Sequence, residues 1–264
     1  MGIRLLIGVG PEEPQLNYHI LLKMIWCMLN ECPPAELWAV VNNAGIVKGF
    51  SVEMSTMDEF KDVFDVNFFG TVRVTKAFLP LLKKSKGRIV NVTSLGGEVT
   101  LPFFTPYLAS KYAAVGFTDC LRHEIEMQGI SVVSIEPEVF LTPMLSWDTI
   151  DKNLDSTFSE RANTAVKNEG YEESLKDLAK LFISSACRDI SIVVDDLESA
   201  VSLEHPDHTY KPNRHAFCRF ILFCFVSMPR SFQILLVKIG SSIFFSKSKI
   251  LKDIVMKIIS LIIK

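Results

Sequence analysis

The chain alternates short apolar runs with longer amphipathic stretches. The apolar runs fall at residues 3–9, 37–41, 88–93 and 130–135. Strands that are buried on both faces of a parallel sheet read as such runs. The stretches with apolar residues at helical spacing fall at 12–31, 57–84 and 106–128, the second interrupted near Gly70. This alternation predicts an α/β fold with a doubly wound parallel sheet, whose ligands bind beyond the carboxyl ends of the strands.

The pattern changes after the last of these strands. Residues 144–170 are polar and poorly periodic, whereas 171–182 and 195–203 read as helices. The apolar segments at 217–228 and 232–245 are each interrupted by a basic residue. Neither reaches the roughly 20 apolar residues that a membrane-spanning helix needs.

Residues 249–264 form the best-defined amphipathic segment of the C-terminal part. Three lysines, an aspartate and a serine line one face of the predicted helix, and isoleucine, leucine and valine line the rest. This pattern is typical of a helix that lies in a membrane interface. A helix that packs on a core or forms a dimer shows a similar apolar stripe, and the excess of lysines favours the membrane.

The charge is distributed unevenly along the chain. Residues 211–264 contain ten basic residues and one acidic residue, a net charge of +9, so residues 1–210 carry −11 of the total of −2. A basic, apolar tail on an acidic globule indicates an anionic membrane surface rather than nucleic acid as a partner. We therefore predict a globular domain over 1–210 and a membrane-associating tail over 211–264.

The six cysteines contain no C-x-x-C pair and no framework of paired spacings. Reduced thiols in a reducing compartment are the simplest interpretation. No cluster of histidine and cysteine has the spacing of zinc ligands, so no metal site is predicted.

A serine and a Tyr-x-x-x-Lys motif carry the candidate chemistry. Ser94 closes an apolar strand, and Tyr107 and Lys111 follow at i and i+4 of a predicted helix, on one face. An ammonium near a phenol favours the phenolate and draws its pKa down from about 10, which makes the tyrosine a general acid/base. Ser94 is placed to hydrogen-bond the oxygen whose charge changes during the reaction.

Further motifs surround this group in a fixed order. Val40-Val41-Asn42-Asn43-Ala44-Gly45 and Asp65-Val66-Asn67 precede it, and the segment from Glu136 to Thr142 follows it. Together these motifs resemble the short-chain dehydrogenase/reductase family over residues 37 to 145. The segments 37–45, 119–122 and 205–206 most resemble the branch that contains retinol dehydrogenases, 17β-hydroxysteroid dehydrogenases and D-3-hydroxybutyrate dehydrogenase.

The resemblance implies a role for each motif residue. Tyr107 is the catalytic acid/base, Lys111 lowers its pKa and holds the nicotinamide ribose, Ser94 positions the substrate oxygen, and Asn67 supports a water relay. Asn42, Ala44, Gly45 and Thr142, with Tyr107 and Lys111, are the implied contacts to NAD or NADP. A capped helix kink at Asn67, and a tight turn at residues 42–45, are the structural alternatives.

Two departures from the family pattern stand out. The glycine-rich turn T-G-x-x-x-G-x-G that cradles a pyrophosphate is absent, and Gly8-Val9-Gly10 is followed by Pro11 and two glutamates. Counting back from Asn42, residues 3–10 match the third strand of the family. This predicts an N-terminally truncated member, with the strand at 3–9 separated from the sheet and the edge of 37–41 exposed. Glu138 also replaces a glycine that lets the backbone approach the nicotinamide.

The expected function is the interconversion of an alcohol and a carbonyl on a lipophilic substrate of retinol or hydroxysteroid type. The alternatives are a D-3-hydroxybutyrate dehydrogenase-like enzyme and a non-catalytic remnant that cannot hold the dinucleotide. The basic tail predicts association with a membrane, of the endoplasmic reticulum first and of the mitochondrion as the alternative. A homodimer is a further expectation.

Overall fold

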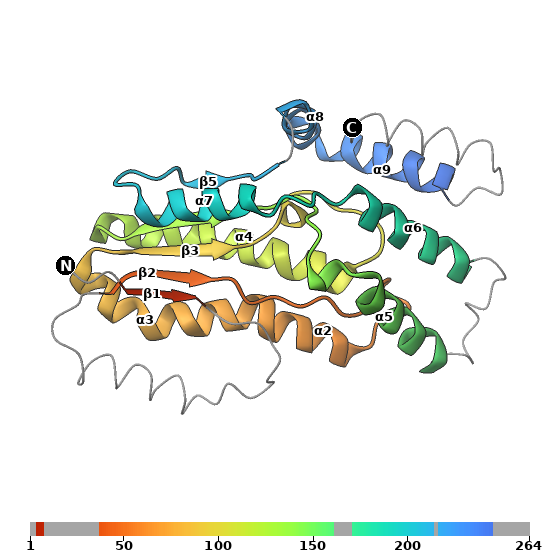
Figure 1. Ribbon diagram of the computed structural model, residues 1–264, viewed down its shortest axis with the longest axis horizontal. Helices are drawn as coiled ribbons and strands as arrows, with labels where there is room; N and C mark the ends of the chain where they lie inside the picture. Colours follow the sequence, from red (N-terminus) through yellow and green to blue (C-terminus); the bar gives the residue numbers. More distant parts are fainter. Residues whose placement is uncertain (1–3, 8–36, 161–170, 214–215, 245–264) are drawn as a thin grey trace.

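A computed structural model describes residues 4–7, 37–160, 171–213 and 216–244 (Figure 1). The predicted helix at 12–31, the Gly8-Val9-Gly10 segment and the amphipathic segment at 249–264 lie outside the described residues.

A parallel sheet with the order β1-β2-β3-β4-β5 forms the centre of the described part. Its strands are β1 (Arg4–Ile7), β2 (Leu37–Asn42), β3 (Arg88–Val92), β4 (Ser131–Ile135) and β5 (Thr209–Tyr210). The three central strands agree within one residue with the apolar runs that predicted them. β5 was not predicted, because a strand of two residues is too short to show an alternation of apolar and polar positions.

The first strand corrects one expectation. β1 pairs with β2 in parallel, with Leu5 opposite Ala39 and Ile7 opposite Val41. The strand at 3–9 is therefore not separated from the sheet, and the edge of β2 is covered. A β2 edge without a neighbour would leave a row of backbone groups unpaired, and any extended segment of suitable length can satisfy them.

The helices follow the predicted periodicity. The expected helix at 57–84 is α2 (Met57–Phe64), the π-helix η1 (Asp65–Gly70) and α3 (Thr71–Ser85), so the interruption near Gly70 is confirmed. The other predicted helices are α4 (Thr105–Ile125) with the short η3 (Glu126–Gln128), α6 (Tyr171–Ser185) and α7 (Ser191–Ser202). The two apolar segments of the tail are α8 (Ala216–Ser227) and α9 (Arg230–Phe244).

The segment that reads as polar and poorly periodic contains α5 (Trp147–Glu160). Ile150 and Leu154 lie on one face of this helix at i and i+4, and both are buried against Leu175 and Ala179 of α6. Trp147, Ile150 and Leu154 stand at helical spacing in the sequence (i, i+3, i+7), so this helix was readable, and the polar residues between them masked the period.

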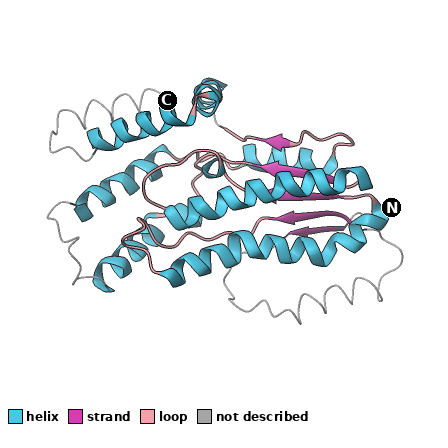
Figure 2. Ribbon diagram, turned by 180° about the vertical axis from the view of Figure 1, so that it is seen from behind, coloured by secondary structure: helices cyan, strands magenta, loops and turns pink. Residues whose placement is uncertain are grey.

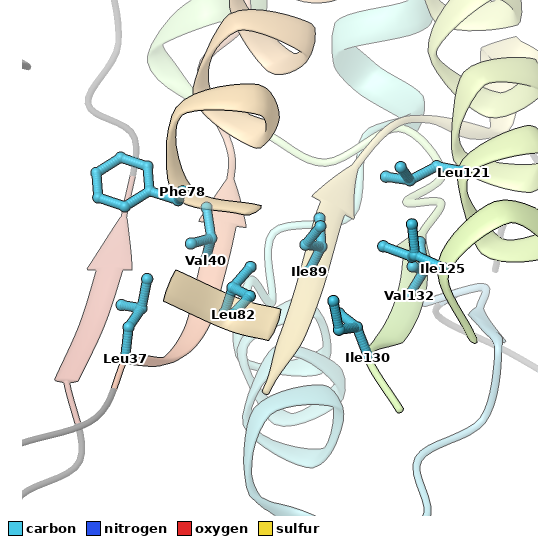
Figure 3. Packing of buried hydrophobic residues seen from close by; sticks show 9 residues of the cluster. All are labelled: Leu37, Val40, Phe78, Leu82, Ile89, Leu121, Ile125, Ile130 and Val132. Carbon is cyan, nitrogen blue, oxygen red and sulfur yellow. The ribbon is translucent and has the colours of Figure 1, made fainter. Parts of the chain in front are cut away.

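Helices cover both faces of the sheet, which confirms the doubly wound fold (Figures 1 and 2). On one face Val40, Ile89 and Val132 pack against α3 and α4, as Figure 3 shows with the buried side chains of Phe78, Leu82, Leu121 and Ile125. On the other face Val41, Val90 and Val133 pack against α7. Consecutive strand residues point to opposite faces, so each central strand is apolar throughout.

A third apolar cluster lies among the loops that follow the strands. Its members come from the segment after β2 (Phe50, Met54), from the segment before α4 (Phe103, Phe104), and from α5 and α6. Within the described residues, no helix has the length and apolar character needed to cross a membrane.

The amino-terminal ends of the strands carry a buried cation. Arg88 is 3% exposed, and its Nη1 donates to the carbonyl oxygens of Ala200 (2.8 Å) and Leu203 (2.7 Å) at the end of α7. Its guanidinium lies 4.6 Å from the ring centroid of Trp38, whose indole nitrogen donates to Val201 O. A cation here offsets the unpaired carbonyls and the negative end of the helix dipole.

Replacing this cation tests whether it fixes α7 on the sheet. We expect Arg88→Ala to lower the free energy of unfolding by about 3 kcal/mol, because two charge-assisted hydrogen bonds are lost in a buried place. Urea denaturation measures the change. Lys84→Ala, at an exposed position of α3, is the control and should stay within about 0.5 kcal/mol of the wild type. An Arg88→Ala variant as stable as this control would contradict the assignment.

Candidate active site

The carboxyl end of β3 brings Ser94 to the first turns of α4. Ser94 follows the strand in an extended conformation, and its Oγ accepts a hydrogen bond from Gly96 N (3.0 Å), which caps the short helix η2 (Leu95–Gly97). Its side chain also lies close enough to the Tyr107 phenol to act on the pKa of that group. Two residues that are thirteen positions apart in the sequence therefore meet, as the motif predicts.

Two glycines allow η2 to lie directly on α4. A Cβ at Gly97 would stand 2.5 Å from Val115 Cγ2 and 2.8 Å from the backbone oxygen of Lys111. A Cβ at Gly96 would stand 2.8 Å from Leu108 Cδ2. Distances below 3.0 Å are not tolerated without a shift, so any larger residue at Gly97 would separate Ser94 from the helix that carries Tyr107.

Lys111 lies one turn beyond Tyr107 on α4, on the side that faces β3. It is 5% exposed, and its Nζ donates to the carbonyl oxygen of Val92 (3.1 Å). The same Nζ is 5.7 Å from the ring centroid of Tyr107. Ser94, Tyr107 and Lys111 therefore form one group at the carboxyl edge of the sheet.

The electrostatics of this group correct the expected direction of one pKa. Burial raises the pKa of the Tyr107 phenol, and the nearby hydroxyl of Ser94 opposes this only in part. Burial also lowers the pKa of the Lys111 ammonium to about 8. The ammonium was expected to draw the pKa of Tyr107 down, but removal of both groups from water has the larger effect.

Asn67 lies in η1, where its side chain holds the loop after β2. Its Oδ1 accepts from Ile46 N (2.8 Å), and its Nδ2 donates to Ile46 O (3.0 Å) and to Ser110 Oγ (2.9 Å). π-Helical turns are frequent at functional sites. Asn67 is thus part of the helix interruption, and it also connects the β2 loop with the face of α4 next to Lys111.

Gly45 brings the β2 loop to the same place. A Cβ built on Gly45 would lie 3.6 Å from Asn67 Oδ1, 3.7 Å from Lys111 Nζ and 3.8 Å from Met144 Cε. These are ordinary contact distances, so space for about one methyl group remains between these side chains. Ala44 is half-buried in the same loop.

Thr142 precedes the short helix η4 (Pro143–Leu145), and its side chain makes no capping hydrogen bond. Met144, two residues later, is the member of this segment that reaches Gly45.

The side chain of Asn42 lies in the core instead. Its Nδ2 donates to Asn91 Oδ1 (2.8 Å) and to Thr75 Oγ1 (3.3 Å), and Asn91 Nδ2 donates to Thr118 Oγ1 (2.9 Å). This buried series joins α3, β2, β3 and α4. These hydrogen bonds fix how β2 and β3 lie relative to each other at their carboxyl ends, where the loops of the site begin.

The start of α4 is strained. Phe103 and Phe104 have positive φ angles of 71° and 55°, a region that bulky residues rarely adopt. Both belong to the third apolar cluster, and the ring of Phe104 lies 5.3 Å from that of Phe50, centroid to centroid. Burial of these rings fixes where α4 begins, and so where Tyr107 stands.

Sequence reasoning missed Ser110, Met144 and the role of the Gly96-Gly97 pair. Ser110 lies three residues after Tyr107 on the predicted helix. Its contact with Asn67 could be predicted only once the position of η1 was known. Two adjacent glycines after Ser94 were a usable signal of close packing. No feature of the sequence around Met144 indicated its contact with Gly45.

Comparison with known proteins agrees with this geometry. The family model of short chain dehydrogenases matches residues 30–153, which contain every candidate site residue. Mouse estradiol 17-beta-dehydrogenase 2 is 38% identical over 246 residues, covering 82% of this chain and 63% of the relative. Rat mitochondrial D-beta-hydroxybutyrate dehydrogenase is 35% identical over 184 residues, covering 68% of this chain and 54% of the relative. The chain thus spans between about half and two thirds of the length of these curated relatives.

Two solved structures share the fold. A short-chain dehydrogenase from Streptomyces avermitilis has a TM-score of 0.61 at 21% identity, over 85% of this chain and 76% of its own. A short chain dehydrogenase/reductase from Burkholderia phymatum, solved in complex with NAD, has a TM-score of 0.55 at 18% identity, over 71% of this chain and 64% of its own.

The parallel sheet, with helices on both faces and polar groups gathered beyond the strand ends, defines a Rossmann-like α/β protein. Within this class the chain belongs to the short-chain dehydrogenase/reductase family, in the branch of the estradiol and hydroxybutyrate dehydrogenases, as the motifs predicted.

The close packing of η2 on α4 can be tested by adding one methyl group. We expect Gly97→Ala to lower the free energy of unfolding by roughly 1–3 kcal/mol, because the new Cβ overlaps the backbone of α4. Gly116→Ala is the control, since a Cβ there would meet no atom of the described residues within 4 Å. It should stabilise the helix by up to about 1 kcal/mol. Equal stability of the two variants in urea would show that η2 is not pressed on α4.

Proposed function

We propose that the protein interconverts an alcohol and a carbonyl with NAD or NADP, using Tyr107 as the acid/base. The observation that carries this proposal is the grouping of Ser94 and the Tyr107 phenol beside the buried ammonium of Lys111, whose Nζ lies 5.7 Å from the ring centroid of Tyr107. A nicotinamide cofactor would supply the hydride acceptor or donor, and the residues of the chain would supply the proton transfer and the orientation.

The residues around Lys111 suit the ribose of such a cofactor. An ammonium has three hydrogen-bond donors, and among the described residues the acceptor for Lys111 is Val92 O. A buried ammonium with unused donors, facing a glycine at a contact distance, suits a ligand with hydroxyl groups. Lys111, Gly45 and Ala44 would hold the nicotinamide half of the cofactor. Asn42 and Thr142 stand at the borders of the loops that carry Gly45 and Met144.

The proton transfer follows from the positions of Ser94 and Tyr107. In alcohol oxidation the phenolate of Tyr107 takes the hydroxyl proton of the substrate, while Ser94 holds the oxygen. In carbonyl reduction the phenol gives this proton back. Because burial raises the pKa of Tyr107, the phenol form predominates near neutral pH. Oxidation is therefore favoured by rising pH, and reduction runs at neutral pH.

The third apolar cluster supports a lipophilic substrate. Phe50, Met54 and the α5–α6 pair pack beside the loops of the site, and Met144 lies at Gly45, whose built Cβ would also contact Lys111. We propose a hydroxysteroid- or retinol-type alcohol as the substrate. Hydroxybutyrate is the second candidate, since the rat relative bears that name.

Removal of the phenol oxygen tests the mechanism. We expect Tyr107→Phe to lower the turnover of the best substrate, from a screen of estradiol, retinol and 3-hydroxybutyrate, by about 10²–10⁴-fold. Binding of NADH, followed by energy transfer from tryptophan, should change little, because Lys111 is intact. The wild-type oxidation rate should rise with pH, and this rise should be absent in the variant.

Tyr112→Phe on the same helix is the matched control and should keep the activity of the wild type. Turnover that survives Tyr107→Phe would exclude the mechanism. A folded wild type that binds neither NADH nor NADPH at millimolar concentration would instead favour the non-catalytic alternative.

We further propose that α8 and α9 attach the protein to an anionic membrane surface, of the endoplasmic reticulum or the mitochondrion. Large apolar side chains of both helices, and of the turn between them, are exposed: Phe220, Phe223, Met228, Phe232, Ile234, Leu235, Leu236 and Ile239. Single exposed apolar residues are ordinary, but a group of this size on two consecutive helices indicates an interaction surface. Segment 216–244 contains basic residues and no acidic residue, which suits anionic lipid better than a second protein chain.

Two phenylalanines test this surface. Phe223 and Phe232 are 68% and 58% exposed, so Phe223→Ser combined with Phe232→Ser should leave the fold intact. We expect at least a tenfold loss of binding to vesicles that contain phosphatidylserine, measured by cosedimentation, because apolar area is no longer buried in the lipid. Met127→Ser, also at an exposed position, is the control. Unchanged vesicle binding, with a dimer that dissociates in the double variant, would assign the surface to a second copy instead.

A further inference from the structure

Three loop ends meet at the carboxyl edge of the sheet and carry Glu98, Glu136 and Lys211. None of them takes part in the proton transfer proposed above. Lys211 Nζ lies 2.7 Å from each carboxylate oxygen of Glu98 and 3.8 Å from Glu136 Oε2. One ammonium therefore faces two carboxylates, one from the segment after β3 and one from the end of β4.

Glu136 is the buried member of this cluster. It is 3% exposed, and its Oε1 accepts from Ser134 Oγ (2.9 Å). Its Oε2 has no hydrogen-bond partner among the described residues. Its backbone nitrogen donates to Tyr210 O (2.8 Å), so the ends of β4 and β5 are joined directly beside Lys211.

The charges around Glu136 decide when it ionises. The pKa of Glu136 is raised to about 7: burial is the largest cause, the carboxylates of Glu98 and Asp119 act in the same direction, and the hydrogen bond from Ser134 and the charge of Lys211 oppose them. Asp119 itself is paired with Arg122 on α4 (2.7 Å). Below pH 7 Glu136 is protonated, and Lys211 then has Glu98 as its ionic partner.

Glu98 is tied to the turn that carries Ser94. The backbone nitrogen of Glu98 donates to Leu95 O (3.0 Å), and Leu95 N donates to Pro137 O (3.0 Å), next to Glu136. The turn from Ser94 to Glu98 is thus held from two sides: by the backbone of the β4 loop at its start and by Lys211 at its end.

We propose that Lys211 is a positioning residue for Ser94, because its bridge between Glu98 and Glu136 fixes the Ser94 turn to the ends of β4 and β5. The inference rests on the proposed function. Without the ammonium, the carboxyl groups of Glu98 and Glu136 face each other at the edge of the sheet. Above the pKa of Glu136 the two like charges repel each other. Glu98, whose side chain is 22% exposed, would turn towards water and release the end of the turn.

A double-mutant cycle with Ser94 tests the proposal, with carbonyl reduction measured at pH 8, above the pKa of Glu136, so that its carboxylate is ionised. We expect Lys211→Met to lower kcat by about ten- to a hundredfold, as displacement of a reacting group does, with NADH affinity within about twofold of the wild type. Lys211→Arg should recover most of kcat, because a guanidinium can bind both oxygens of Glu98. Lys76→Met, an exposed lysine of α3, is the control and should not change kcat.

In a Ser94→Ala background, Lys211→Met should cause no further loss, because a residue that acts through Ser94 has nothing left to position. Losses that multiply in the double variant, or an unchanged kcat for Lys211→Met, would overturn the proposal. If Lys211→Met does not fold, Glu98→Gln weakens the same bridge from its other end and must show the same dependence on Ser94. An inactive wild type would refute the proposed function itself, a result distinct from all of these.

Discussion

The contact between η2 and α4 is the constraint on which the candidate site depends. Gly97 has no side chain, so the turn after β3 lies against the backbone of Lys111 and removes that part of α4 from water. The same contact brings Ser94 within hydrogen-bonding reach of Tyr107. The position of the serine, the desolvation of the lysine and the raised pKa of the phenol are therefore consequences of one close approach.

Burial, rather than pairing of opposite charges, determines the protonation states of this group. Lys111 has a neutral backbone carbonyl as its partner, and an ammonium without a counter-charge in a buried place has a lowered pKa. Arg88 at the opposite end of the strands is also buried, but two carbonyls at a helix terminus and an indole ring surround it. The carbonyls that bind Arg88 belong to the end of a helix, so this cation has a structural role, whereas Lys111 lies beside an ionisable phenol, and ionisable groups with a shifted pKa gather at functional sites.

The sequence determined most of the fold, because the central strands are buried on both faces and the helices repeat their apolar positions over several turns. It did not determine the pairing of β1 with β2, which depends on backbone groups that any extended segment can satisfy. The Ser94, Tyr107 and Lys111 group was readable because a strand end and one helix face place these residues together. The bridge of Lys211 to Glu98 was not, since it joins residues 113 positions apart, and no local pattern records such a contact. The direction of the Tyr107 pKa was missed for a similar reason: spacing on a helix places two groups near each other but does not say how much water surrounds them.

The helix α4 connects the site with the C-terminal helices. Tyr107 and Lys111 face β3, whereas Tyr112, the next residue, accepts a hydrogen bond from Arg230 at the start of α9 (3.3 Å). Adjacent residues of a helix point about 100° apart, so one short stretch of α4 contacts the reacting group on one side and the apolar helices on another. Lys211 forms a second link, from the segment before α8 to the turn of Ser94. The C-terminal helices are thus joined to the elements of the site at two points, through Arg230 to α4 and through Lys211 to the turn of Ser94.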